Sequence, residues 1–275
     1  MIKQRPPRLK RLPINRLIPN MLTVTALCAG MTAINFASRE MWEASVFAIV
    51  VAAVLDGLDG RVARMLNAQS KFGAELDSLS DFISFGVAPP MILYFWTLEH
   101  AGRIGWVFVL FFTICMALRL ARFNTALEAP DKQEWENNFF TGVPAPAGAL
   151  LIMYPLVLSF MFGDDFFRNP AMAAVFLIAI GGLMVSRIPT FSFKKAKVAQ
   201  AYVLPVMIGV GLIAAFLVSA PWAMLSVIGA IYLGSIPLSL KSYRTWKKRA
   251  ERGEFDVNDE DLDIHDPEHQ KDDKE

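Results

Sequence analysis

The chain has 275 residues, of which 54% are hydrophobic and only 19% are charged, and its formal net charge is +1. An ordinary globular chain carries about 25% charged residues, and the two cysteines, Cys28 and Cys115, lie inside apolar stretches. This composition excludes a soluble enzyme, a nucleic-acid-binding protein, a disulfide framework and a cysteine-based zinc site. It predicts an all-α polytopic membrane protein.

The two ends of the chain are charged in opposite senses. The first 16 residues hold six Lys or Arg and no acid, so residues 1–17 either lie in the headgroup layer against anionic lipid or only fix the topology. The apolar stretch after them resembles a signal peptide, but it is long and lacks a cleavage site, which indicates a retained helix. The tail 241–275 is first basic; its last 23 residues hold eleven acids and two Lys. We expect that acidic part to be disordered.

Between these ends run apolar stretches of about 20 residues, the length that a helix needs to cross a bilayer. We predict about eight spans inside a membrane domain of residues 18–240, namely 18–37, 42–60, 73–96, 104–123, 143–162, 170–188, 199–219 and 221–240.

The positions of Lys and Arg predict the orientation of these spans. With the N-terminus in the cytoplasm, the cytoplasmic segments hold 22 Lys or Arg, and the opposite side holds three, Arg39, Arg103 and Arg168. We therefore expect a multi-pass protein of the inner (cytoplasmic) membrane with both termini in the cytoplasm.

Four carboxylates break the apolar pattern where the second span ends and the third begins. Asp56 and Asp59 are three residues apart, and Asp77 and Asp81 are four apart, so each pair lies on one face of its helix. A short turn joins the two helices, which makes them antiparallel neighbours and brings the four acids to one depth near the cytoplasmic surface.

Acids in membrane helices are costly and like charges repel, so something positive must offset them. Oxygen-only ligands fit Mg²⁺ or Mn²⁺ better than zinc, and four carboxylates suffice for two ions in a site suited to displacement at phosphorus. The alternative is a set of helix-end acids paired with Arg61, Arg64 or Lys71, which does not account for four acids on two facing stripes.

Small residues and one arginine accompany the acids. Gly57, Gly60 and Gly73 leave room for a ligand to approach the backbone, although glycine also serves to pack membrane helices. Arg64 is placed either to bind a phosphate or to brace an aspartate.

Residues 56–81 read D-x2-D-G-x2-A-R-x8-G-x3-D-x3-D. This pattern resembles the signature of the CDP-alcohol phosphatidyltransferase family at every specified position. The resemblance implies a membrane enzyme with a six-helix core, usually a homodimer. Such an enzyme uses divalent metal to transfer a phosphatidyl group from a CDP-linked lipid to an alcohol, with release of CMP.

Position by position, the resemblance implies roles for the residues of the motif. Asp56, Asp59 and Asp77 match metal ligands, and Asp81 matches the general base, which is also a ligand candidate. The positions that match contacts to the CDP-lipid are Gly60, Arg64, Ser70, Gly73, Asn20 and Thr23. Asn20, Thr23 and Ser70 are the weaker matches, since Asn and Thr near a helix start also serve as caps.

A second set of segments resembles the phosphatidylserine synthases within that family and implies L-serine as the acceptor alcohol. The segments are Ser84–Pro89, Arg119–Asn124, Phe140–Pro146 and Ser186–Phe191. Serine is a zwitterion whose carboxylate needs cationic donors, so Arg119, Arg122 and Asn124 are candidate serine ligands. Anchoring at the cytoplasmic face is the alternative role of the two arginines.

Two other functions stay open at this point. The first keeps the chemistry and changes the alcohol to choline, glycerol 3-phosphate or an inositol phosphate, for which a denser basic pocket or an aromatic cage would be expected. The second is an ion-coupled transporter, which predicts acids near mid-bilayer and broken helices in two repeated halves. The acids cluster at one surface and no repeat is found, which favours the enzyme.

Overall fold

The computed structural model describes residues 17–127, 139–186, 189–191 and 219–235, together with Gly209 and Phe216. Its elements in chain order are α1 (Leu17–Ala37), α2 (Trp42–Met65), α3 (Lys71–Asp81), the π-helical segment η2 (Phe82–Val87), α4 (Ala88–Trp96), the short 3₁₀ turn η3 (Leu98–Ala101), α5 (Arg103–Leu127), β1 (Phe139–Thr141), α6 (Ala145–Ile152), α7 (Tyr154–Phe162), α8 (Asp164–Phe167), α9 (Pro170–Val185) and β2 (Pro189–Phe191). A further helix covers Pro221–Ser235.

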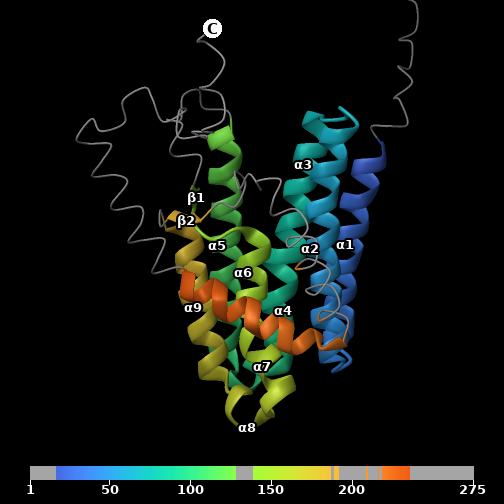
Figure 1. The fold of residues 1–275 in the computed structure, drawn as a ribbon. Coiled ribbons are helices and arrows are strands. Elements are labelled where there is room, and N and C mark those ends of the chain that lie inside the picture. Colours follow the sequence, from blue (N-terminus) through green and yellow to red (C-terminus); the bar gives the residue numbers. More distant parts are fainter. Residues whose placement is uncertain are drawn as a thin grey trace, which may run out of the picture.

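The segments α3, η2 and α4 form one continuous helical stretch, Lys71–Trp96, here called the α3–α4 rod. The helices form an upright bundle in which α1, α2 and this rod lie on one side and α5, α6 and α9 on the other (Figure 1). The predicted all-α class is confirmed. The one departure among the described residues is a pair of three-residue antiparallel strands, in which Phe139 pairs with Phe191 and Thr141 with Pro189.

Helix α1 packs on α2 through small residues. Its buried residues recur every three or four positions and so form one stripe: Pro19, Thr23, Ala26, Gly30, Ala33 and Ala37. The facing side of α2 contributes Ser45, whose hydroxyl donates to the carbonyl of Ala33 at 2.7 Å. Small residues allow close approach of the two backbones, as is usual between membrane helices.

The other side of the bundle is filled by larger apolar side chains. Phe112 and Met116 of α5 and Leu177 of α9 are fully buried, as are Ile152 and Leu156 of the α6–α7 pair. Gly181 lets the ring of Phe111 approach, since a Cβ at this position would lie 3.1 Å from that ring. The core of this half is therefore filled by apolar side chains.

Three described helical stretches are long and apolar enough to cross a membrane, namely Leu17–Ala37, Lys71–Trp96 and Arg103–Thr125. They match the predicted spans 18–37, 73–96 and 104–123. Helix α2 has the length, at 24 residues, but its charged residues exclude it on composition alone. It covers the predicted span 42–60.

The later predicted spans differ more from the structure. The span 143–162 is a pair, α6 and α7, bent by 42°, where Pro155 at the start of α7 cannot donate a backbone hydrogen bond. The span 170–188 is represented by α9, which is only 16 residues long.

The last two predicted spans are not established by the structure. The span 199–219 lies almost wholly outside the described residues. Within 221–240 the structure describes the helix Pro221–Ser235, which runs obliquely across the other helices (Figure 1, orange), and 236–240 lie outside the described residues. The count of eight spans therefore stays a prediction, as do the basic segment and the tail, because 1–16 and 241–275 are not described.

Candidate active site

The acidic motif folds as two helices, α2 and α3, joined by a short turn to form a hairpin. Helix α2 ends in a Schellman motif, in which Ala68 N donates to Ala63 O at 2.9 Å and Asn67 N donates to Arg64 O at 3.2 Å. Asn67 takes the left-handed conformation, with φ 48°. Ser70 then caps α3, because its hydroxyl accepts from Gly73 N at 3.0 Å. These caps stop one helix and start the next within five residues.

The hairpin places the acids in register. Asp59 lies six residues before the end of α2 and Asp77 six residues after the start of α3, which is about 9 Å along each helix at 1.5 Å per residue. Asp56 and Asp81 lie about 14 Å along by the same measure. The acids therefore lie in two layers along the helices, Asp59 with Asp77 and Asp56 with Asp81.

Three of the four acids form a group that fits a metal ion. Ligand oxygens of Asp56, Asp59 and Asp77 all lie within 4.8 Å of one another. Asp81 lies beside this group, since its carboxyl contacts that of Asp56 and interacts with Asp77. The four predicted acids are thus brought together, and Asp81 lies at the end of α3 that is farther from the connecting turn.

The hydrogen bonding of the acids tests whether a cation fits here. Asp77 Oδ1 and Asp81 Oδ1 are buried and have no hydrogen-bond partner within the described part of the chain. A buried carboxylate oxygen without a donor is costly unless a positive partner completes it. Oxygen atoms are also the ligands that Mg²⁺ and Mn²⁺ prefer. The donor set therefore fits a hard divalent cation.

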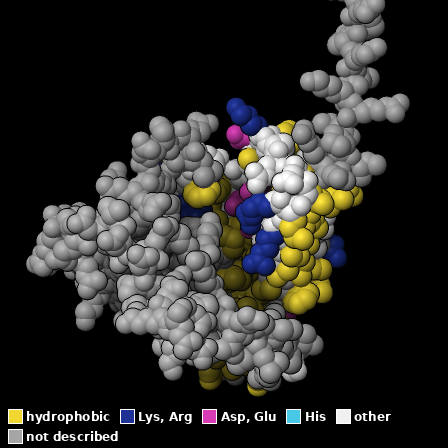
Figure 2. Space-filling model, turned by 45° about the horizontal axis from the view of Figure 1, so that its top comes forward, with side chains coloured by type: hydrophobic (Ala, Val, Ile, Leu, Met, Phe, Trp, Pro, Cys, Tyr) yellow, Lys and Arg dark blue, Asp and Glu magenta, His cyan; other side chains and the backbone are white. Residues whose placement is uncertain are grey.

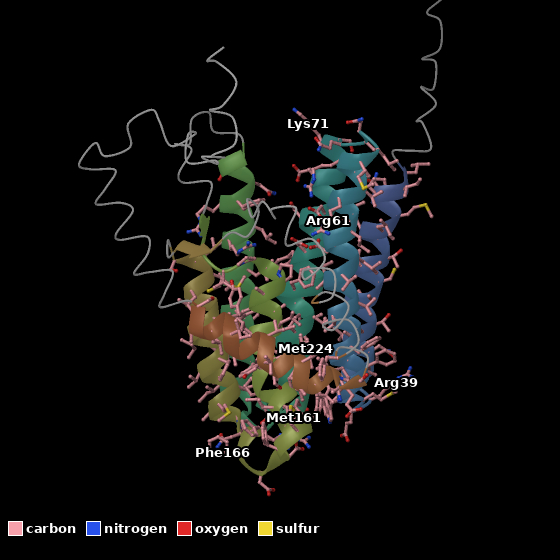
Figure 3. All side chains as sticks on the ribbon, viewed as in Figure 1. Arg39, Arg61, Lys71, Met161, Phe166 and Met224 are labelled. Atoms are coloured by element: carbon pink, nitrogen blue, oxygen red, sulfur yellow. The ribbon has the colours of Figure 1, made fainter. Side chains whose placement is uncertain are left out.

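Basic and acidic side chains gather on one face of the α1–α3 side of the molecule (Figure 2). Figure 3 labels Arg61 and Lys71 toward one end of the bundle and Arg39 at the other. Arg64 is exposed and makes no ion pair with any residue that the structure describes. Pairing of the acids with arginine, the alternative to a cation site, is thus not found for Arg64.

The glycines of the motif differ in their surroundings. A Cβ at Gly57 or Gly60 would meet no described atom within 4 Å. Neither glycine therefore packs a helix in the described part of the chain, and both leave open space beside the acids. A Cβ at Gly73 would lie 3.1 Å from both Asn20 Oδ1 and Ser70 Oγ, so these three predicted residues converge at the start of α3.

Thr23 connects α1 to the acidic hairpin. Its hydroxyl donates to Asp59 Oδ2 at 2.5 Å, and its carbonyl accepts from Ser80 Oγ at 3.2 Å. Thr23 had been singled out in the sequence only as a contact to the CDP-lipid. Its bond to Asp59 was not predicted, because sequence spacing does not reveal contacts between helices 36 residues apart.

Directly after Asp81 the helix widens into η2, and this feature was also missed. Ala88 N donates to Ile83 O, one residue farther back than in an α-helix. Pro90 has no N–H for the carbonyl of Gly86, which instead accepts from Thr113 Oγ1 at 3.0 Å. The pair Pro89-Pro90 is the sequence signal for this irregularity.

The candidate serine ligands lie on the last turns of α5. Arg119 interacts electrostatically with Asp81, and its Nε donates to Val143 O at 2.6 Å. Asn124 donates to Ser78 Oγ at 3.0 Å, next to Asp77 in the chain. Arg119 and Asn124 are therefore brought to the acidic site.

Arg122 points elsewhere. Its guanidinium donates to the carbonyls of Val185, Met184 and Ser186, at 2.7, 3.3 and 3.2 Å, and so satisfies the end of α9, where helical carbonyls lack partners. Gly142, with φ 82°, packs against the same place, because a Cβ there would lie 2.8 Å from Met184 O. Arg122 and the β1–β2 pair thus join three segments that the sequence analysis had selected separately.

Comparison with known proteins is consistent with this site. The family model of CDP-alcohol phosphatidyltransferase matches residues 16–236. A CDP-diacylglycerol–serine O-phosphatidyltransferase of Mycobacterium leprae is 38% identical over 238 residues, which cover 86% of this chain and 79% of the relative. The protein of the same name from Helicobacter pylori (strain 26695) is 40% identical over 68% of this chain and 77% of its own length. That of Methanocaldococcus jannaschii is 34% identical over 62% and 72%.

Proposed function

The chain belongs to the CDP-alcohol phosphatidyltransferase family, and we propose that it transfers the phosphatidyl group of CDP-diacylglycerol to the hydroxyl of L-serine, giving phosphatidylserine and CMP. The observation that carries this proposal is the acidic hairpin, with three carboxylates within 4.8 Å and two buried oxygens that have no partner among the described residues. The choice of L-serine is supported by the names of the relatives.

Asp56, Asp59, Asp77 and Asp81 would hold Mg²⁺ or Mn²⁺, and four carboxylates provide enough oxygens for two ions. Bound there, the cations would neutralise the pyrophosphate of the CDP-lipid and make the lipid-linked phosphorus more electrophilic. The proximity of the acids and their lack of donors support this assignment.

Asp81 is the proposed general base, which accepts the proton of the serine hydroxyl as the hydroxyl oxygen attacks phosphorus and CMP leaves. Its buried Oδ1 has no donor within the described residues, so this oxygen is available to take a proton. Arg119, which interacts with Asp81, would bind the carboxylate of the serine substrate and so direct its hydroxyl toward the base. Arg122 and Asn124 bond to other protein groups, and we assign them supporting roles.

The proposed contacts to the CDP-lipid lie near the turn that joins α2 and α3. Asn20, Ser70 and Gly73 converge there, and the Ser70 hydroxyl, which accepts from Gly73 N, can still donate its proton to a phosphate oxygen. Gly60 provides open space, and Arg64 is exposed one turn farther along α2. An Arg guanidinium in this place suits the bidentate binding of phosphate.

The cellular setting is also part of the proposal. The apolar helices place the chain in a membrane. The distribution of Lys and Arg supports the inner (cytoplasmic) membrane, cytoplasmic termini and an active site at the cytoplasmic face. We also propose a homodimer, as family membership suggests, and the division into 1–17, 18–240 and 241–275.

The decisive experiment incubates the purified protein with CDP-diacylglycerol and L-serine and measures CMP release. We expect release with L-serine, loss with a chelator, and recovery when Mg²⁺ or Mn²⁺ is restored. Parallel reactions with choline, glycerol 3-phosphate and inositol phosphate compare the acceptors. Faster release with one of these alcohols would replace L-serine, and no release with any of them would refute the enzyme assignment.

A further inference from the structure

Thr23 is the one described residue of α1 whose side chain and backbone bond to different arms of the acidic hairpin. Its hydroxyl donates to Asp59 on α2 at 2.5 Å, and its carbonyl accepts from Ser80 on α3 at 3.2 Å. All three residues are at most 5% exposed. Thr23 thus bonds to both of the helices that carry the acids.

The Thr23 hydroxyl has one hydrogen and two acceptors in reach, because Pro19 O also lies 3.1 Å away. The bond to Asp59 is shorter, and a bond to an ionised acceptor is roughly twice as strong as a neutral one. The hydrogen therefore goes to Asp59. With its hydrogen committed in this way, Thr23 has no proton to donate to a phosphate oxygen of the CDP-lipid.

Asp59 depends on this bond for its orientation. Its carboxyl belongs to the group of three that lies within 4.8 Å, and the residue exposes less of its surface to solvent than Asp56 and Asp77 do. A metal ligand held by a neighbouring hydrogen bond keeps its geometry, and removal of such a partner typically lowers metal affinity about 10–100-fold.

We propose that Thr23 is a positioning residue that acts through Asp59: its hydroxyl orients this carboxylate for a divalent cation, and it contributes to the affinity for the cation, not to the binding of the CDP-lipid. The inference rests on the proposed function only in that the acids bind a cation.

The test is a titration of the purified full-length protein with Mn²⁺ in detergent and without substrate, in which free Mn²⁺ is measured by electron paramagnetic resonance. Thr23→Val, which removes the hydroxyl and keeps the shape, should bind Mn²⁺ about 10–100-fold more weakly. Thr23→Ser keeps the hydroxyl and should restore the affinity.

Thr25 provides a matched control on the same helix. Its hydroxyl donates to the carbonyl four residues back, Met21 O, at 2.7 Å and is exposed. Thr25→Val makes the same substitution on the same helix, away from the acids, and should bind Mn²⁺ as the wild type does. Thermal unfolding without metal checks that each variant is folded, and Thr23→Ala takes the place of Thr23→Val if the latter does not fold.

A kinetic readout separates positioning from substrate binding. The Mn²⁺ concentration that gives half-maximal CMP release should rise about 10–100-fold in Thr23→Val, while the KM for CDP-diacylglycerol at saturating Mn²⁺ stays as in the wild type. Wild-type affinity for Mn²⁺ in both Thr23→Val and Thr23→Ala, or a change confined to the KM for CDP-diacylglycerol, overturns the inference alone. Absence of Mn²⁺ binding by the wild type overturns it together with the cation site.

Discussion

Two neighbouring sets of charges in this protein are treated in opposite ways. On the α2–α3 hairpin, Asp77 and Asp81 each keep a buried oxygen without a partner among the described residues. On α5, Arg122 donates to three carbonyls at the end of α9. The arginine bonds stabilise the fold itself, whereas each of these acids keeps an oxygen that a bound cation would contact.

Whether a charged group has hydrogen-bond partners within the chain distinguishes charges that stabilise the fold from charges that bind a ligand more clearly than residue type does. A buried polar group without a partner costs stability, so its presence is best explained by a ligand that the protein binds. A guanidinium whose donors are used by backbone carbonyls stabilises the chain. Substitutions on the two sides should therefore change different observables, and four of them test the comparison.

The largest effect is expected for Asp81→Asn. Asparagine keeps the shape but cannot accept a proton as a base, so turnover should fall by about 10²–10⁴-fold. Binding of Mn²⁺ should fall less than turnover, because Asp81 lies beside the group formed by Asp56, Asp59 and Asp77 and not within it. Binding of CDP-diacylglycerol should change little. Single-turnover CMP release and a Mn²⁺ titration of the same preparation measure the two quantities. Near wild-type turnover would remove Asp81 from the role of base.

Asp56→Asn should weaken metal binding itself. The loss should be at least the roughly 10–100-fold that follows removal of a residue supporting a ligand, and higher Mg²⁺ or Mn²⁺ should partly recover activity. Glu43→Gln is the matched control, because Glu43 is an exposed acid at the other end of the same helix. Equal metal dependence of the two variants would contradict the site.

Arg122→Gln should act on stability. Hydrogen bonds to charged groups contribute about 1.5–3 kcal/mol, so loss of the guanidinium should lower the free energy of unfolding by about that amount. Thermal or denaturant unfolding measures this change, with the exposed Arg39→Gln as the control. Arg119→Gln should instead raise the KM for L-serine. If Arg122→Gln raised that KM more than Arg119→Gln did, serine binding would belong to Arg122.

The smallest effects come from two glycines. A Cβ at Gly86 would lie 2.6 Å from Met116 Cγ, so Gly86→Ala should cost about 1–3 kcal/mol through overpacking. Gly60→Ala meets no described atom within 4 Å and replaces a poor helix former, so it should stabilise by up to about 1 kcal/mol. It should also raise the KM for CDP-diacylglycerol. Unfolding curves and initial rates measure both, and destabilisation by Gly60→Ala would indicate a packing role.

Much of this arrangement could be predicted from local pattern. Spacings of three and four residues place Asp56 with Asp59 and Asp77 with Asp81, and the short turn between the helices makes the pairs meet. The bounds of α1, α5 and the α3–α4 rod follow from apolar runs that end in charge or glycine. These features depend on residues close together in the chain, and the sequence displays them directly.

Contacts between distant segments could not be predicted in this way. Nothing in the local sequence pairs Thr23 with Asp59. Arg119 and Arg122 are the same residue type in similar settings on α5, so the sequence also does not show which of them bonds to the carbonyls of α9. The bend before Pro155 and the short α9 were also missed, since hydropathy measures how apolar a segment is and not how straight it runs. The segment 199–219 lies almost wholly outside the described residues, so the span predicted there is not tested.

The π-helical segment after Asp81 has a consequence for how one rod can serve two neighbours. Inserting a single extra residue into an α-helix rotates everything beyond it by about 100°. The first half of the rod can therefore aim its carboxylates at α2, while the second half turns Ile92 and Trp96, both fully buried, into the apolar interior. Deleting one residue between Phe82 and Val87 would leave the length and hydropathy of the helix almost unchanged. The shortened helix could keep the acids aligned with α2 or keep Ile92 and Trp96 in the interior, but not both.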